Sequence, residues 1–163
     1  MPNPYRGEIP PDPNAGHPAG AARLRAAAPR IAALALQEAL ARDASFRDRY
    51  DDAKLRLFLR DYEAHLERVA RSLASGSDYW VQEWGEWIAA VMRRRRVLTS
   101  DLVTLIAAIG PAAKAVLSPA EQEALDGILD RWVARQARNR KLAGDRKRNP
   151  ILAFFWRGVG IAD

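Results

Sequence analysis

His65 is the residue of this chain whose chemistry is easiest to name. An imidazole can ligate a haem iron or act as a base, and His65 stands beside the apolar positions Tyr62, Leu66 and Val69. The other histidine, His17, lies in a stretch rich in proline and glycine. His65 is therefore a candidate cofactor ligand, although a hydrogen-bonded histidine at the border of the core is the favoured interpretation.

Most other site chemistry is excluded by composition. The 163 residues contain no cysteine, so disulfides, thiolate zinc sites, iron–sulfur clusters and thiol catalysis are excluded. The acidic residues lack the Glu-x-x-His pairs of di-iron bundles, and no nucleophile elbow or phosphate-binding glycine loop occurs. We expect no metal, no cofactor and no enzymatic activity.

Three tryptophans follow helical spacing. Trp80, Trp84 and Trp87 stand at positions i, i+4 and i+7, which places them on one stripe of a helix. Aromatic residues at this spacing usually fill a core, but tryptophan is also enriched at subunit interfaces, and an indole can stack on a planar ligand. The stripe is therefore also a candidate oligomer interface.

Positive charge is concentrated at the end of the chain. Of 26 basic residues, nine lie in residues 131–163 with only two acidic ones, so this stretch carries a formal charge of +7 and residues 1–130 carry −1. Such asymmetry is typical of a segment that contacts a partner. The candidate partner-binding residues are the basic and aromatic ones of this segment: Arg138, Arg140, Lys141, Arg146, Lys147, Arg148, Phe154, Phe155, Trp156 and Arg157. A second basic run, Arg93 to Arg96, complements the dipole at the end of a predicted helix or binds an anion.

The pattern along the chain predicts helices. Residues 1–20 hold six prolines and are expected to be an extended or disordered leader. From residue 21, apolar positions recur at helical spacing, with Ile31, Leu34, Ala35 and Leu40 as the first stripe. The clearest helix starts after a corner at residues 45–52, with Asp51 or Asp52 as its cap, and ends at Gly76.

Later helices are expected over residues 79–95, from a cap at Thr99, Ser100 or Asp101 onward, and from the capping box of residues 118–121 to about residue 141. Gly110 and Pro111 should kink or split the helix that contains them. No segment alternates with the period of a strand. The prediction is an all-α bundle of four to six helices over residues 21–143, followed by a basic-aromatic tail over residues 144–163. Without a signal peptide or an apolar run long enough to span a membrane, we expect a cytoplasmic protein.

Four segments together suggest a family. Residues 58–66 (FLRDYEAHL), 79–87 (YWVQEWGEW), 95–98 (RRVL) and 117–121 (LSPAE) give a helix with Asp-x-x-x-His-Leu, a tryptophan-bearing helix that ends in arginine, and a helix that starts with Ser-Pro. This order resembles the N-terminal sensor domains of stressosome-type regulators over about residues 30–135. The resemblance implies a globin-like fold without haem, dimerisation and protein–protein signalling, and it supplies no active-site residues.

These observations predict a non-enzymatic interaction or sensor module. It would self-associate through the tryptophan-bearing face and dock a protein partner through the C-terminal tail. One alternative is a nucleic-acid-associated protein that uses the basic tail electrostatically. A second is a carrier of a tetrapyrrole or lipid within the bundle. Adhesion of the tail to a membrane surface also remains open.

Overall fold

The computed structural model describes the backbone of residues 9–148 and the side chains of residues 9–139. Its elements, in chain order, are α1 (Pro18–Ala26), α2 (Ala28–Arg42), α3 (Phe46–Arg49), α4 (Asp52–Ser75), α5 (Tyr79–Arg94), α6 (Thr99–Ala107), α7 (Ile109–Ala113), the 3-10 turn η1 (Lys114–Val116) and α8 (Pro119–Arg148). No strand occurs among the described residues. The prediction of an all-α helical bundle is thus confirmed, but the described residues form more helices than the four to six expected, because α1, α3 and α7 are short additional helices.

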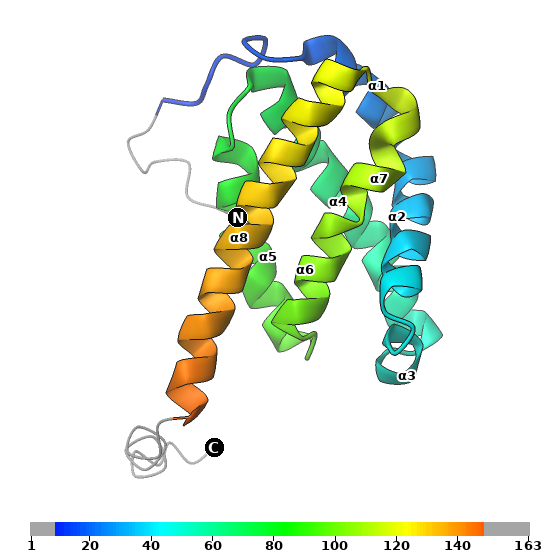
Figure 1. Ribbon diagram of the computed structural model, residues 1–163, viewed down its shortest axis with the longest axis vertical. Helices are drawn as coiled ribbons and strands as arrows, with labels where there is room; N and C mark the ends of the chain where they lie inside the picture. Colours follow the sequence, from blue (N-terminus) through cyan, green and yellow to red (C-terminus); the bar gives the residue numbers. More distant parts are fainter. Residues whose placement is uncertain (1–8, 149–163) are drawn as a thin grey trace.

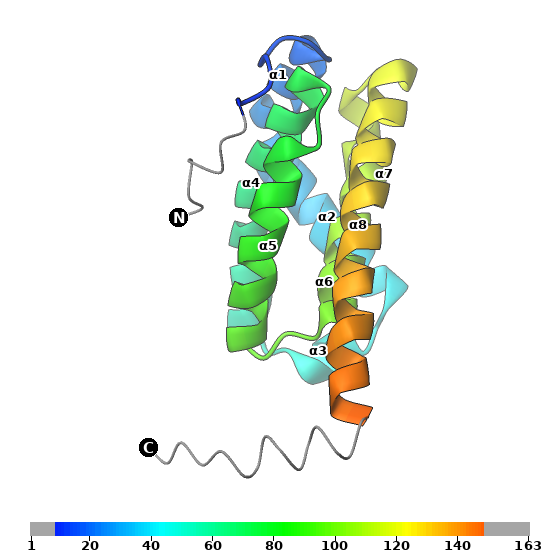
Figure 2. The same cartoon turned by 90° about the vertical axis from the view of Figure 1, so that its left-hand side faces the viewer.

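The helices pack in two layers. Helices α4 and α5 lie side by side in one layer, and α6 and α8 lie side by side in the other (Figures 1 and 2). Helix α2 contacts α4, α6 and α7, and helix α1 contacts α4. Helix α4 is therefore the central element, because it also contacts α8.

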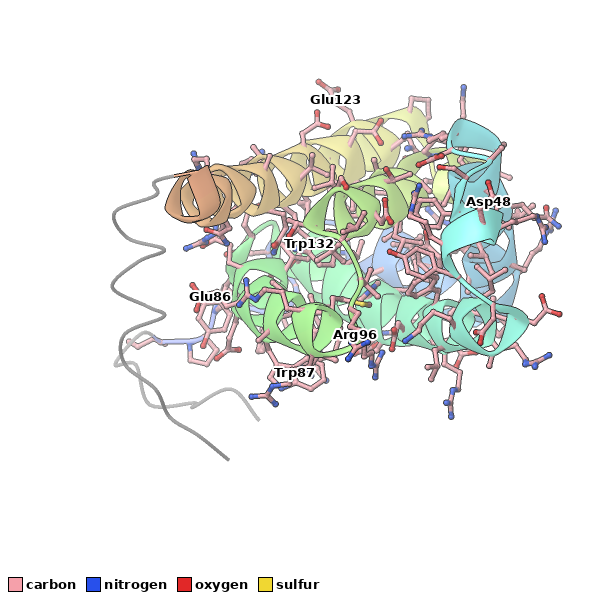
Figure 3. The ribbon with its side chains drawn as sticks, turned by 90° about the horizontal axis from the view of Figure 1, so that it is seen from below. Asp48, Glu86, Trp87, Arg96, Glu123 and Trp132 are labelled. Carbon is pink, nitrogen blue, oxygen red and sulfur yellow. The ribbon has the colours of Figure 1, made fainter. Side chains whose placement is uncertain are left out.

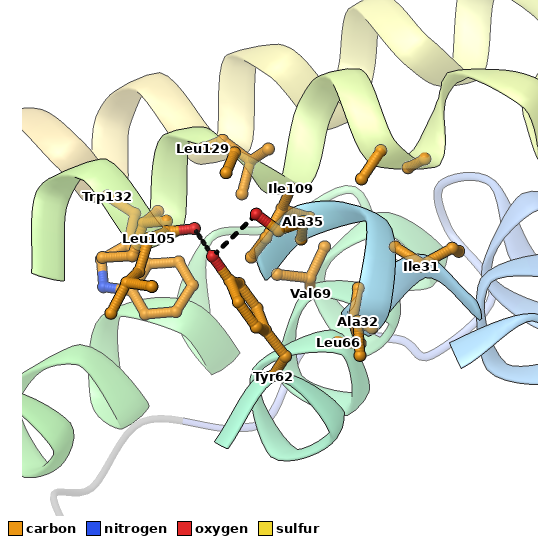
Figure 4. Close-up of a cluster of buried hydrophobic side chains, with 14 of the residues drawn as sticks. Ile31, Ala32, Ala35, Tyr62, Leu66, Val69, Leu105, Ile109, Leu129 and Trp132 are labelled. Carbon is orange, nitrogen blue, oxygen red and sulfur yellow. Dashed lines mark hydrogen bonds between the residues drawn. The ribbon is translucent and has the colours of Figure 1, made fainter. Parts of the chain in front are cut away.

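The core forms where these layers meet (Figure 4). Tyr62 of α4 is buried there, and its hydroxyl lies 2.7 Å from the carbonyl oxygen of Leu105 and 3.5 Å from that of Ala35. Burial raises the pKa of Tyr62 well above its usual range. The hydroxyl stays protonated and links α4 to α6, while its ring packs among aliphatic side chains.

Local signals place most helix ends correctly. The carboxylate of Asp51 accepts a hydrogen bond from the backbone N–H of Lys54 at 2.8 Å, and Gly76 ends α4 with a φ of 66°. Ser118 and Glu121 form the predicted capping box, in which the Glu121 carboxylate accepts from the Ser118 N–H at 2.8 Å. The predicted split occurs as well, because α6 ends at Ala107. Pro111 has no N–H group, so it cannot donate the helical hydrogen bond to the carbonyl oxygen of Ala107.

Four local predictions need correction. The corner at residues 45–52 contains the short helix α3, and Leu34 is 38% exposed because the buried side of α2 consists of Ile31, Ala32, Ala35 and Ala39. The first helix begins at Pro18, ahead of residue 21. Helix α8 continues through Gly144 to Arg148, beyond the predicted end near residue 141.

Residues 16 and 17, expected in the leader, are fixed to the end of α4. The N–H groups of Gly16 and His17 donate to the carbonyl oxygens of Ala74 and Leu73 at 2.7 and 2.8 Å. These bonds satisfy carbonyls at the C-terminus of α4 that have no partner within the helix. The approach is so close that a Cβ on Gly16 would lie 2.3 Å from the backbone nitrogen of Gly76.

One stretch of the described residues is apolar and long enough to span a membrane by composition alone. It runs over Thr99–Val116 with a mean hydropathy of 1.2 across 18 residues. The chain divides this stretch into α6, α7 and η1, and half of it is buried against the rest of the bundle. The buried half belongs to the core, with Leu102, Leu105 and Ile109 among its buried side chains.

Candidate functional site

His65 lies in an aromatic cluster between α4, α5 and α8. The Nε1–H of Trp84 donates a hydrogen bond to Nδ1 of His65 at 2.9 Å. The rings of Tyr62, Trp84 and Trp132 surround the imidazole edge to face, with centroids 6.0, 6.0 and 5.6 Å away. Burial, followed by the positive charge of Arg95, lowers the pKa of His65 to about 3. The imidazole is therefore neutral at pH 7, and its contacts favour a packing role over axial ligation.

Helix α8 closes this cluster against Gly85 of α5. The amide of Gln136 donates to the carbonyl oxygen of Gly85 at 3.0 Å, and a Cβ on Gly85 would lie 2.6 Å from Nε1 of Trp132. The buried atoms Trp132 Nε1 and Gln136 Oε1 have no hydrogen-bond partner among the described residues. Glycine at position 85 thus lets the indole of Trp132 approach the α5 backbone directly.

The three candidate interface tryptophans of α5 differ in their exposure. Trp80 and Trp84 are half-buried, whereas Trp87 is 40% exposed (Figure 3). Arg71 lies over the ring of Trp80 at 5.3 Å and Arg68 over that of Trp84 at 5.1 Å. These cation–π contacts keep two of the indoles covered on one side.

Trp87 is the member of the stripe that the body covers least. Its ring packs on Trp84 with centroids 4.6 Å apart and an interplanar angle of 36°. We call Trp80, Trp84 and Trp87 the tryptophan face. A position in the core does not describe Trp87. Its ring contacts Trp84 of the same face and leaves much of its surface exposed to solvent.

The basic run at the end of α5 divides into two kinds of residue. The guanidinium of Arg95 pairs with Asp61 of α4 at 2.7 Å. Arg93, Arg94 and Arg96 are exposed and form no ion pair within the described part of the chain. Arg96 has a φ of 60°, where the chain turns from α5 toward α6. Three cations are therefore presented to solvent at this corner.

Six of the ten candidate partner-binding residues lie in the last part of α8. Arg138 is exposed, and Arg140, Lys141, Arg146, Lys147 and Arg148 lie on helical backbone. Phe154, Phe155, Trp156 and Arg157 lie outside the described residues. The structure brings neither this end of α8 nor the basic corner of α5 into the aromatic cluster around His65, so the predicted site residues form separate groups.

Sequence reasoning missed a polar cluster that joins α3 to α6. Asp101 is buried, and its carboxylate accepts from the hydroxyl of Tyr50 at 2.6 Å and from two nitrogens of Arg49 at 3.0 Å each. The sequence suggested Asp101 as a helix cap, but no side chain caps α6. The sequence analysis also did not identify Arg68 and Arg71, which lie over Trp84 and Trp80. The available signal was their spacing of three residues on α4, close to the four-residue spacing of the two tryptophans on α5.

The residues described hold no group of three or more His, Cys, Asp or Glu side chains placed to bind a metal ion. Comparison of the chain with protein families, curated proteins and solved structures gives no match.

Proposed function

We propose that this protein is a non-enzymatic helical interaction module of the cytoplasm. It self-associates through the tryptophan face and docks a protein partner through the basic-aromatic C-terminal end. The observation that carries the proposal is the exposure of Trp87 beside two half-buried tryptophans. Tryptophan is costly to leave in water and is enriched where two protein surfaces meet.

The second surface is supported by the length of α8. Gln136 is the last buried side chain described on this helix, yet the helix continues to Arg148. At 1.5 Å per residue this is about 18 Å of additional helix. Figures 1 and 2 draw this end beyond the ends of the neighbouring helices. The part of α8 after Gln136 carries six basic residues, which suits it to an acidic partner surface.

The resemblance to stressosome-type sensor domains supports the same proposal. Such a domain has a globin-like fold without haem and acts through protein contacts. A bundle whose single core histidine is held by Trp84 is compatible with that class. The globin-like topology and the sensory role are part of the proposal.

Self-association is tested by sedimentation velocity over a range of protein concentrations. We expect the full chain to form an oligomer, and Trp87→Gln to dissociate more readily because the substitution removes exposed aromatic area. Leu34→Gln is the matched control, since Leu34 is 38% exposed on α2, away from α5. A wild-type protein that remains monomeric at high concentration would overturn the self-association half of the proposal.

Partner docking is tested in the full chain with the triple variant Arg146→Gln, Lys147→Gln and Arg148→Gln. The wild type and the variant are used as baits in native lysate, and bound proteins and nucleic acids are both identified. We expect loss of a protein partner with an unchanged oligomeric state. Equal capture by the two baits would contradict docking through this end.

A nucleic-acid-associated protein is the second candidate, and one observation favours it. The C-terminal ends of α5 and α8 lie at the same end of the bundle (Figures 1 and 2), so exposed Arg93, Arg94 and Arg96 share that end with the basic half of α8. Phosphate contacts make affinity fall steeply with salt. Fluorescence anisotropy with a labelled DNA duplex, measured at a series of salt concentrations, tests this candidate function. An absence of salt-sensitive binding would exclude a nucleic-acid-associated role.

A further inference from the structure

The surface of α5 that points away from the core carries four residues in a narrow stripe. Glu83, Trp87, Ala90 and Arg94 follow one another at spacings of four, three and four residues. At about 100° per residue these side chains leave the helix within roughly 60° of one another. The buried residues Val81, Ile88 and Met92 lie on the opposite side of α5. We call these four residues the outer face of α5.

The charges at the two ends of this face have opposite signs. Glu83 and Arg94 are eleven residues apart, about 16 Å along the helix axis. Neither forms an ion pair with another residue in the part of the chain that the structure describes. The neighbouring Glu86 is different, because it pairs with Arg135 of α8 at 3.7 Å. The outer face is thus apolar in its middle, acidic at one end and basic at the other.

We propose that the occupant of this face is the same face of a second copy of the chain. The two copies pack antiparallel about a two-fold axis that runs between their α5 helices, at the level of residues 88 and 89 along each helix. This inference rests on the proposed self-association and specifies its geometry. The axis places Glu83 of one copy opposite Arg94 of the other, twice per dimer. It also places Trp87 of each copy against Ala90 of the other.

Charge complementarity selects the antiparallel arrangement. A parallel pairing would set Glu83 against Glu83 and Arg94 against Arg94, so both ends of the contact would be repulsive. The antiparallel two-fold pairing makes both ends attractive, and such an isologous contact closes at two subunits. The small side chain of Ala90 leaves room for an indole at the usual separation of packed helices, about 8–10 Å.

The four residues have different tasks in this contact. Burial of the exposed Trp87 rings supplies most of the affinity, because apolar area removed from water dominates association. The pairs of Glu83 with Arg94 lie at the rim, so they fix orientation and register more than they add affinity. A change of their sign therefore tests the geometry without removing the aromatic contact.

The experiment measures the dimer dissociation constant of four full-length proteins by sedimentation: wild type, Glu83→Arg, Arg94→Glu and the double charge exchange. Each single reversal makes two like-charge pairs per dimer, and we expect it to weaken the dimer about tenfold or more. The double exchange restores opposite charges and should return the constant to within about threefold of wild type. Circular dichroism verifies that all four proteins are folded.

Glu123→Arg and Arg30→Glu are the matched controls. Both residues are exposed and lie on other helices, and Figure 3 shows Glu123 on the side of the bundle opposite Trp87. These reversals change the net charge by the same amount and should leave the dimer unaltered. A general charge effect would move controls and test variants together, and it would overturn the specific pairing.

The remaining outcomes separate this inference from the proposed function. A wild-type oligomer that tolerates both single reversals, or that is not restored by the double exchange, overturns the antiparallel contact and leaves self-association standing. A wild type that stays monomeric overturns both the proposed self-association and the antiparallel contact. Weakening by each single reversal together with recovery in the double exchange supports the contact.

Discussion

The indole of Trp84 fixes the tautomer of His65. The Trp84 Nε1–H donates to Nδ1 of His65 at 2.9 Å, so the imidazole proton resides on Nε2, and the added proton of an imidazolium has no place on Nδ1. Trp84 is also under Arg68 and against Trp87. A single side chain therefore connects the buried histidine with the tryptophan face.

The first prediction concerns pH. The pKa of His65 is about 3 in the folded state and 6.5 in the absence of burial. His65 of the unfolded chain therefore takes up a proton below pH 6.5, whereas His65 of the folded chain stays neutral down to about pH 3. The contribution of His65 to stability is consequently full above pH 6.5 and decreases as the pH falls toward 3. One pKa unit corresponds to about 1.4 kcal/mol. Between pH 6.5 and 5 the free energy of unfolding should fall by about 2 kcal/mol through this residue.

Urea unfolding of the wild type and of His65→Asn at pH 7.5 and pH 5 checks this prediction. Asparagine offers an acceptor for the Trp84 N–H but does not titrate in this range. The variant should lack the histidine's share of the pH dependence. Identical losses of stability in the two proteins would show that His65 does not remain neutral.

The second prediction concerns Gly85. Its replacement by alanine would set Cβ 2.6 Å from Nε1 of Trp132 and 3.0 Å from Nε2 of Gln136. Overpacking of this kind costs about 1–3 kcal/mol, more than alanine gains in helix propensity. We expect Gly85→Ala to lower the free energy of unfolding, measured in urea.

Gly127→Ala is the control for that substitution. Gly127 lies in α8, where the nearest atom to a new Cβ is the guanidinium nitrogen of Arg131 at 3.2 Å, at the end of a flexible side chain. Alanine should there stabilise the helix by up to about 1 kcal/mol. Destabilisation of similar size at both positions would show that the contact of Gly85 with Trp132 does not cause the loss of stability in Gly85→Ala.

The helices were predictable because their signals are local. The cap at Asp51, the stop at Gly76 and the capping box at Ser118 each depend on residues within four positions. Gly144 gave the opposite signal, yet α8 continues beyond it. A single glycine costs a helix only about 1 kcal/mol, and residues on both sides of Gly144 favour helix.

The site was less predictable because its contacts join distant segments. Trp84 binds His65 across 19 positions, and Tyr50 binds Asp101 across 51. Helical spacing placed Trp80, Trp84 and Trp87 on one face, but it could not show that arginines of α4 would cover two of them. The orientation of α4 relative to α5 decides that, and it depends on the packing of the whole bundle.

The third prediction concerns Asp101. Asparagine at this position keeps the shape but loses the charge that Arg49 contacts through two nitrogens at 3.0 Å. Because Asp101 is buried and also accepts from Tyr50, we expect Asp101→Asn to cost about 1–3 kcal/mol in urea unfolding. The exposed Asp48→Asn on the adjacent α3 should change stability by less than about 0.5 kcal/mol. Equal effects of the two substitutions would contradict a structural role of the cluster.

The fourth prediction concerns the junction of α1 with α8. Hydrogen bonds from Ser118, followed by the Arg23 guanidinium, lower the pKa of Glu121 from 4.5 to about 2. The folded state thus favours the carboxylate, so its stabilising effect is present above pH 4.5 and is lost as the pH falls toward 2. Glu121→Gln should lower Tm at pH 6 and lower it much less at pH 3, measured beside the exposed control Glu123→Gln. A Tm difference from wild type that stays constant over this range would show that the charge of Glu121 does not stabilise the junction.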